Sequence, residues 1–130
     1  PIINENDTVS TEEIRIGDND TLGAIVAASV RADLLVLMSD IDGLYDSDPH
    51  KNPQAKLIRE VRTLTPEILS LGGGAGSARG TGGMVTKLHA AQIATGAGCD
   101  MVILNGENPE LLYRLLDGEA VGTRFYAGEA

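Results

Sequence analysis

A glycine-rich segment followed by a lysine is the strongest local indication of chemistry in this sequence. Residues 80–87 read GTGGMVTK. Glycines that lead into a helix allow backbone N–H groups to converge on an anion at the positive end of that helix. We expect Lys87 in the first helical turn, where its charge opposes the helix dipole unless a polyphosphate lies nearby. The pattern matches neither a P-loop, because Thr86 precedes the lysine, nor G-x-G-x-x-G. It favours phosphate binding over the alternative, a glycine linker with a solvated lysine.

A second group of polar residues follows a predicted buried strand. Residues 34–38 read LLVLM, a continuous apolar run typical of a strand that is covered on both faces, and Ser39 and Asp40 come directly after it. Ligands of open α/β sheets bind outside the carboxyl ends of the strands. Asp40 is therefore a candidate for orienting a nucleotide or for binding Mg²⁺ through water, with an ordinary turn as the alternative. For Asp42, which precedes Gly43, we expect only a turn.

A third group, rich in carboxylates and amides, lies between a predicted strand and a predicted helix. Residues 4–7 read NEND and residues 17–21 read GDNDT. Such side chains can recognise the ammonium and carboxylate ends of an amino acid. Acidic groups this close repel one another unless a cation, a ligand amine or a lysine joins them. The alternative is helix capping, and we expect Asp18 or Asp20 to cap the helix that begins at Thr21.

Apolar runs that alternate with helical periodicity predict an α/β fold with a mainly parallel sheet. The predicted strands span 1–4, 33–38, 101–104 and 123–126, and residues 57–64 are predicted to contain a strand or one arm of a hairpin. The predicted helices span 21–31, a short segment from Thr65, 84–95 and 109–116. Thr65 has the residue type of a helix cap, and the proline after it suits the first helical position. A long exposed loop is expected over 45–55 and a glycine-rich loop over 72–83.

The composition excludes several classes of function. The chain has 130 residues, of which 42% are hydrophobic, so it forms one domain or one part of a larger one. No apolar run approaches the roughly 20 residues of a membrane helix. Ten basic and 19 acidic residues give a net charge of −9, which repels nucleic acids and anionic membranes. The same charge repels ATP unless local cations or a metal reverse the field.

The cysteine content and the N-terminus indicate the kind of protein this is. A single cysteine, Cys99, forms no internal disulfide, and no basic segment precedes an apolar stretch as in a signal peptide, so we expect a cytoplasmic protein. No spacing of Cys and His suits a zinc site, and we expect no dedicated metal ligands. The chain begins with the apolar run PII, typical of an interior strand that follows an earlier element. We therefore expect this sequence to be a piece of a longer protein.

The three polar segments together resemble the amino acid kinase family. The matching stretches are 1–7, 17–22, 37–45, 80–87 and 122–125, which span nearly the whole chain. The combination of NEND with GDND is similar to the members that act on glutamate. The resemblance implies a three-layer αβα sandwich. It also implies transfer of the γ-phosphoryl group of ATP to the γ-carboxylate of L-glutamate.

The resemblance also implies roles for single residues. Asp7 and Asn19 match glutamate ligands, and Asn4 and Asp18 match residues that support them. Asp20 is similar to the carboxylate that organises the catalytic lysines, and Lys87 to the lysine that contacts the transferring phosphate. The positions that match the nucleotide site are Ser39, Asp40, Thr81, Gly82, Gly83, Met84, Val85, Thr86 and Lys87. The implied cofactors are ATP and Mg²⁺, and the implied partners are L-glutamate, proline as a feedback inhibitor, and further copies of the chain.

The N-terminal half of the family's domain, with its own phosphate-binding lysine, has no counterpart in this chain. We therefore expect residues 1–130 to be the C-terminal, nucleotide-binding half of one kinase domain, with little or no activity alone. The alternatives to a kinase that acts on glutamate are other enzymes with related glycine segments. They are acetylglutamate kinase, aspartokinase and uridylate kinase. The alternative from another class is a non-catalytic fragment that binds a nucleotide or an amino acid.

Overall fold

The structure is a computed structural model that describes residues 2, 19–47, 51–72 and 78–127. Most of the predicted first strand, together with Asn4, Asp7 and Asp18, lies outside the described residues. None of the helices in the described ranges is long and apolar enough to cross a membrane.

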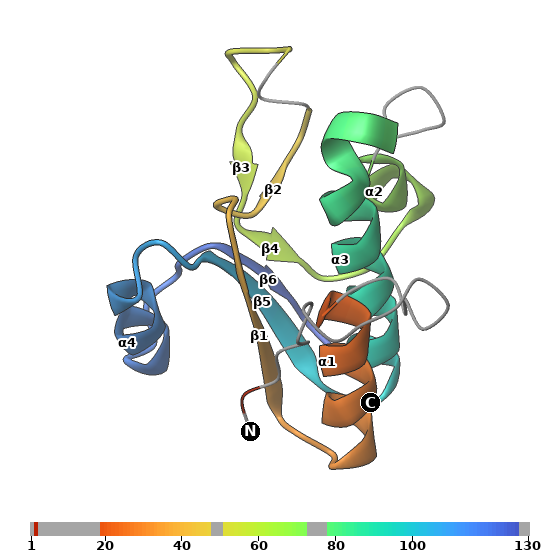
Figure 1. The fold of residues 1–130 in the computed structure, drawn as a ribbon, viewed down its shortest axis with the longest axis vertical. Coiled ribbons are helices and arrows are strands. Elements are labelled where there is room, and N and C mark those ends of the chain that lie inside the picture. Colours follow the sequence, from red (N-terminus) through yellow and green to blue (C-terminus); the bar gives the residue numbers. More distant parts are fainter. Residues whose placement is uncertain (1, 3–18, 48–50, 73–77, 128–130) are drawn as a thin grey trace, which may run out of the picture.

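A four-stranded sheet forms the centre of the fold, in the order β1-β5-β6-β4 (Figure 1). Its strands are β1 (Leu34–Ser39), β4 (Glu60–Val61), β5 (Asp100–Asn105) and β6 (Thr123–Phe125). β1 runs parallel to β5, and β4 runs parallel to β6, whereas β5 and β6 are antiparallel. A separate antiparallel hairpin joins β2 (Leu44–Tyr45) to β3 (Leu57–Ile58). The predicted mainly parallel sheet is thus confirmed.

Helices cover both faces of this sheet. α1 (Asn19–Ser29) and α3 (Ala78–Gly96) lie side by side on one face, and α4 (Glu110–Leu116) lies on the other (Figure 1). The short helix α2 (Pro66–Ser70) precedes α3. This arrangement of helix, sheet and helix is the three-layer sandwich that the resemblance implied.

The side chains of β5 explain why the layers form. Met101 and Ile103 pack into a core with α1 and α3, whereas Val102 and Leu104 pack into a second core with α4. All four side chains are 0% exposed. Successive side chains of a strand point to opposite faces, so a strand that is apolar at every position must be covered on both. The continuous run MVIL therefore requires a helix layer on either side.

Two helix boundaries follow the predicted signals. Thr65 caps α2, because its Oγ1 accepts a hydrogen bond from the Ile68 N–H at 3.2 Å, and Pro66 is the first helical residue. Gly118 follows α4 with φ +95°, a left-handed conformation that favours glycine. The prediction that α2 begins at Thr65 and Pro66 is confirmed.

Other predicted boundaries are wrong. α3 begins at Ala78 and includes the glycines at 80, 82 and 83, so part of the predicted loop is helical. Lys87 consequently lies near the middle of α3 and not in its first turn. Glycine costs a helix only about 1 kcal/mol per residue, which tertiary packing of the remaining helix offsets. Asp20 lies inside α1 and does not cap it, because the helix begins at Asn19.

The segment between β1 and α2 contains more strands than predicted. The predicted strand over 57–64 divides into β3 and β4, and Tyr45, expected in a loop, belongs to β2. Gly43 lies close to the buried Thr123, whose Oγ1 accepts a hydrogen bond from the Leu44 N–H at 2.9 Å. The base of the hairpin is thus anchored to β6.

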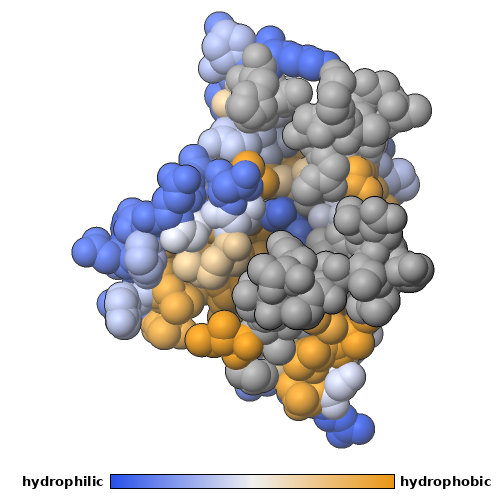
Figure 2. Space-filling model, viewed as in Figure 1, coloured by the Kyte–Doolittle hydropathy of each residue, from blue (hydrophilic) through white to orange (hydrophobic). Residues whose placement is uncertain are grey.

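The surface shows a division of polarity in the view of Figure 2. The end of the β2–β3 hairpin is hydrophilic, whereas hydrophobic residues gather over α1. Ile25 and Val30, both 45% or more exposed, belong to α1 and to the turn after it. This part of the molecule therefore presents apolar side chains to its surroundings.

Among the glycines with described surroundings, Gly122 is the one that the fold requires most strictly. Its φ is +64°, and a Cβ at this position would overlap the carbonyl oxygen of Ile103 on the central strand. Gly122→Ala should lower the free energy of unfolding by about 3 kcal/mol, because backbone strain and a steric clash combine. Gly118→Ala is the control, since φ is +95° there but the space is open, and it should cost only about 1 kcal/mol. Equal losses for both variants in urea denaturation would contradict this explanation.

Candidate functional site

An ion pair joins α1 to α3. The Nζ of Lys87 lies 3.1 Å from the Oδ2 of Asp20, although 67 residues separate the two in the sequence. The side chains are only 10% and 17% exposed, respectively. The hydroxyl of Thr86 also donates to the Oδ2 of Asp20 at 3.1 Å. The structure therefore brings together the two residues that sequence reasoning assigned to catalysis, with Thr86 beside them.

Helical spacing explains why these side chains meet. Asp20, Ala24 and Ala27 are four and three residues apart, so they share one face of α1. Lys87 and three alanines share a buried face of α3 in the same way, namely Ala90, Ala91 and Ala94. Small alanine side chains let the two helices approach closely. The charged pair lies at one end of this alanine-lined interface.

The burial of the pair has an electrostatic consequence. Removing two charges from water is costly, and their attraction in a region of low dielectric offsets much of that cost. A buried ion pair is therefore seldom retained for stability alone. We interpret the Asp20–Lys87 contact as a means of holding an ammonium group in one place.

A second group of polar residues lies at the carboxyl ends of β1 and β5. Ser39 is the last residue of β1 and pairs with Asn105, the last residue of β5. The Ser39 hydroxyl donates to the Oδ1 of Asp40 at 3.2 Å and accepts a hydrogen bond from the Ile41 N–H at 3.4 Å. Asp40 is exposed, and Ser39 is partly buried. The predicted nucleotide residues Ser39 and Asp40 thus lie together at the sheet edge where ligands of α/β proteins bind.

Three side chains at the same edge were not predicted as a group. Asn105 donates from its Nδ2 to the Oδ1 of Asp42 at 2.9 Å, and the Tyr45 hydroxyl donates to the Oδ2 of Asp42 at 3.2 Å. Burial raises the pKa of Tyr45, and the charge of Asp42 and its hydrogen bond raise this pKa further. The turn expected at Asp42 is present, but its carboxylate also joins two strands. Asn105 and Gly106, at the end of β5, are the sequence feature that marks a polar strand end.

The other described residues that were predicted to belong to the site lie on α1 and α3. Asn19 is exposed at the first position of α1, next to Asp20. Met84 is partly buried, and Val85 is 47% exposed. Thr81, Gly82 and Gly83 lie within the first two turns of α3.

The helical start at Ala78 changes the expected phosphate geometry. The first four N–H groups of a helix lack partners within it, and in α3 these belong to residues 78–81. Lys87 lies six residues beyond Thr81, roughly 9 Å further along the helix axis. These N–H groups and the backbone of Lys87 therefore lie at different positions along α3.

The described residues contain no group of three or more side chains that could hold a metal ion by themselves. Proteins usually bind Mg²⁺ through one or two carboxylates together with substrate phosphates. The exposed carboxylate of Asp40 at the sheet edge is a ligand of the required kind.

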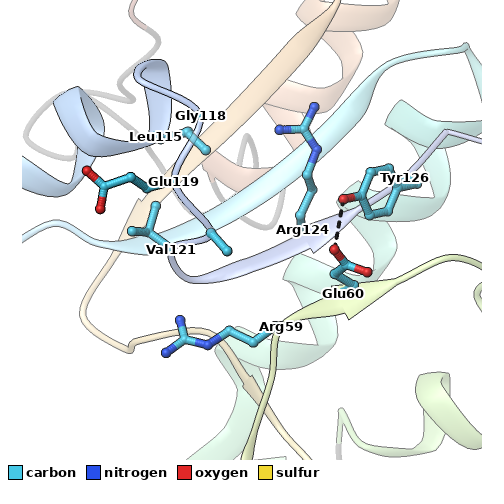
Figure 3. Close-up of a pocket in the computed structure, with 9 residues that line it drawn as sticks. Arg59, Glu60, Leu115, Gly118, Glu119, Val121, Arg124 and Tyr126 are labelled. Atoms are coloured by element: carbon cyan, nitrogen blue, oxygen red, sulfur yellow. Dashed lines mark hydrogen bonds between the residues drawn. The ribbon is translucent and has the colours of Figure 1, made fainter.

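A cavity of about 180 Å³ lies between the turn after α4 and strands β4 and β6 (Figure 3). The Tyr126 hydroxyl donates to the Oε2 of Glu60 at 3.2 Å in its wall, and Arg124 forms an ion pair with Asp100 at 2.7 Å. Among the residues that the structure describes, no predicted site residue lines this cavity. It therefore contributes nothing to the site at the sheet edge.

Cys99 is unsuited to act as a nucleophile. Its side chain is buried, and burial raises the pKa of the thiol, with smaller contributions from the charges of Asp100 and Asp33. The reactive thiolate is thereby disfavoured.

Comparisons with known proteins identify relatives of the chain. Residues 1–105 match the profile described as "Amino acid kinase family". A glutamate 5-kinase from Clostridium perfringens is 57% identical over 131 residues, covering 98% of this chain and 49% of the relative. Other glutamate 5-kinases are 52–59% identical, and the chain spans 33–48% of their lengths. The chain thus corresponds to half or less of these relatives.

Two solved structures share the fold. The uridylate kinase from Archaeoglobus fulgidus superposes with a TM-score of 0.64 and 26% identity, covering 82% of this chain and 46% of that chain. The carbamate kinase from Giardia lamblia bound to AMP-PNP gives a TM-score of 0.60 and 25% identity, covering 84% and 32%, respectively.

The buried pair makes a measurable prediction about stability. Asp20→Ala and Lys87→Met should each lower the free energy of unfolding, because each removes the attraction between two buried opposite charges. The double variant should cost less than the sum, with a coupling energy of about 1–3 kcal/mol. The matched control is the pair Arg62–Glu60, whose side chains are 69% and 49% exposed. The coupling energy of this exposed pair should be below about 1 kcal/mol. Equal coupling energies for the two pairs in denaturant titrations would refute the effect of burial.

Proposed function

The chain belongs to the amino acid kinase family, and from this premise we propose that it forms the nucleotide-binding half of a kinase acting on L-glutamate. The reaction transfers the γ-phosphoryl group of ATP to the γ-carboxylate of L-glutamate and gives L-glutamyl 5-phosphate, the first intermediate of proline biosynthesis. The observation that carries this proposal is the buried contact between Asp20 and Lys87. The identity to glutamate 5-kinases over nearly the whole chain supports glutamate as the acceptor.

Lys87 is the residue that stabilises the transferring phosphoryl group. Phosphoryl transfer depends mainly on alignment and on neutralising negative charge, with little covalent help from the protein. Asp20 holds the ammonium group at a fixed place, and Thr86 donates to the same oxygen of Asp20. No general base is needed, because the attacking carboxylate is already ionised near pH 7.

The nucleotide contacts the sheet edge and the start of α3. Ser39 and Asp40 lie at the carboxyl end of β1, the usual ligand position in α/β folds. The N–H groups of residues 78–81 present partial positive charge to a phosphate. The other proposed contacts come from Gly82, Gly83, Met84 and Val85. Mg²⁺, held by the phosphates and by a carboxylate such as that of Asp40, reduces the repulsion between ATP and this acidic chain.

Glutamate binds near the first turn of α1. Asn19 is exposed there and lies next to Asp20, so we place its amide at the glutamate site. Asp7, Asn4 and Asp18 complete this part of the proposal on the strength of the family motif. Their carboxylates suit the ammonium group of the substrate, and the amides suit its carboxylates.

The proposal extends to the setting of the enzyme. We place it in the cytoplasm, with no nucleic-acid or membrane partner, as the net charge of −9 favours. Exposed Ile25 and Val30 support self-association of the chain. Proline is proposed as a feedback inhibitor on the family resemblance.

A second candidate is a non-catalytic fragment that binds a nucleotide or an amino acid. It is favoured by one observation, that the chain spans 49% or less of the glutamate 5-kinases compared. Calorimetry with MgATP and with glutamate separates the two candidates, because a binding module binds without turnover.

The direct test is formation of γ-glutamyl hydroxamate by the full-length protein with MgATP, L-glutamate and hydroxylamine. Product that depends on both substrates supports the proposal. Turnover with another acceptor, such as acetylglutamate, aspartate or a nucleoside monophosphate, and none with glutamate would overturn the choice of substrate.

The role of Lys87 gives a sharper prediction. Lys87→Met in the full-length protein should lower kcat by roughly a hundredfold or more, because a charge-stabilising donor is lost. Lys87→Arg should restore little, since the planar guanidinium does not fit the place of a compact ammonium group. Arg114→Met, at an exposed ion pair on α4, is the control and should leave kcat unchanged. Retention of more than about a tenth of the activity in Lys87→Met would show that another group has this role.

A further inference from the structure

The carboxylate of Asp42 connects three elements at the sheet edge. Asp42 belongs to the turn between β1 and β2. Its Oδ1 accepts a hydrogen bond from Asn105 at the end of β5, and its Oδ2 accepts one from Tyr45 in β2. Both oxygens are thus used, each by a residue from a different strand. Hydrogen bonds to a charged acceptor are among the stronger ones in proteins.

The end of β5 provides a fixed point for this contact. The Oδ1 of Asn105 accepts a hydrogen bond from the Glu107 N–H at 2.8 Å, which orients its amide so that the Nδ2 faces Asp42. The Gly106 N–H donates to the Ser39 carbonyl at 2.6 Å. A Cβ on Gly106 would lie 3.3 Å from the Cβ of Met38, so the two chain segments are closely packed.

The other side of the turn is also anchored. The Leu44 N–H donates to the hydroxyl of Thr123, which is 0% exposed and also donates to the Ile58 carbonyl at 2.5 Å. The turn over residues 40–43 is therefore held at both ends by buried or paired backbone. Between these ends, Asp42 is the residue whose side chain ties the turn to β5.

We propose that Asp42 is a positioning residue that fixes the turn carrying Ser39 and Asp40 in the orientation that binds the nucleotide. The inference rests on the nucleotide role of Ser39 and Asp40 proposed above. Without the link to Asn105, the turn has rotational freedom, and nucleotide binding must restrict it. A binding site that is ordered in advance avoids this entropic cost.

The negative charge of Asp42 makes the inference testable, because the two possible roles predict opposite changes in nucleotide affinity when the charge is removed. A carboxylate near a polyphosphate repels it, so an Asp42 with no positioning role would weaken nucleotide binding. Its removal would then strengthen binding. A positioning role predicts the opposite result, because loss of the hydrogen bonds outweighs the relief of repulsion.

The experiment compares Asp42→Ala, Asp42→Asn and Asn105→Ala in the full-length protein. MgATP affinity is measured by calorimetry, and KM for each substrate and kcat are measured in the hydroxamate assay. Asp42→Ala and Asn105→Ala should each weaken MgATP binding about tenfold, with kcat and the KM for glutamate within about twofold. Asp42→Asn retains an acceptor for Asn105 and a polar partner for Tyr45, so it should bind MgATP within about twofold of the wild type. The double alanine variant should be no weaker than either single variant, because the two residues share one interaction.

Glu107→Ala is the matched control, because it removes an exposed carboxylate at the same edge and leaves the backbone contact of Glu107 in place. It should leave MgATP affinity unchanged or slightly increased. The inference is overturned if Asp42→Ala binds MgATP as tightly as the wild type or more tightly. It is also overturned if kcat and thermal stability fall while both KM values rise together, which indicates a purely structural role.

The outcomes separate this inference from the proposed function. A protein that binds MgATP but never phosphorylates glutamate would refute the proposed substrate, and the ratio of MgATP affinities would still decide the role of Asp42. A wild-type protein that binds no nucleotide would overturn both. If Asp42→Ala fails to fold, Asn105→Ala supplies the same comparison, because it removes the same hydrogen bond from the other side.

Discussion

The burial of β5 on both faces is the constraint on which the rest of the structure depends. Met101 and Ile103 require cover from α1 and α3, and Val102 and Leu104 require cover from α4. An apolar strand between two helix layers can only be central, so β1 and β6 must pair on either side of it. The polar residues that follow β1 and β5 are thereby brought to one edge.

The packing of α1 on α3 links this core to the candidate chemistry. Alanines on the facing sides of the helices let the backbones approach, and the same helix faces continue into Asp20 and Lys87. The position of the ammonium group is thus set by helix packing and not by a flexible loop. The proposed phosphoryl transfer depends on alignment, so it benefits from a lysine that is held on a rigidly packed helix.

The sheet edge, where we propose that the nucleotide binds, places two carboxylates in different surroundings. Asp40 and Asp42 both lie there, yet they have different surroundings. Asp40 is exposed and contacts only its neighbour Ser39 among the hydrogen bonds described for its side chain. Asp42 is engaged by Asn105 and Tyr45. Two carboxylates separated by one residue are therefore suited to different roles, one toward a ligand and one within the protein.

The amino-acid pattern alone determined the fold class and the principal residues. The apolar runs at β1 and β5 identified the buried strands, because a strand without polar positions must be covered on both faces. Thr65 and Pro66 located the start of α2, since capping chemistry is local. The glycine segment indicated Lys87, an acidic-amide segment contained Asp20, and the end of a buried strand indicated Ser39 and Asp40. The family resemblance supplied their roles.

Only the tertiary structure decided where these residues meet. Local propensity placed the glycines at 80–83 in a loop, but α3 extends through them because the energy of helix packing exceeds the local cost of glycine. Asp42 suggested a turn, and nothing in its neighbourhood in the sequence indicated Asn105, 63 residues away, as its partner. The contact between Asp20 and Lys87 spans 67 residues. Such contacts arise from the order in which strands and helices assemble, which is a property of the whole fold and not of any segment.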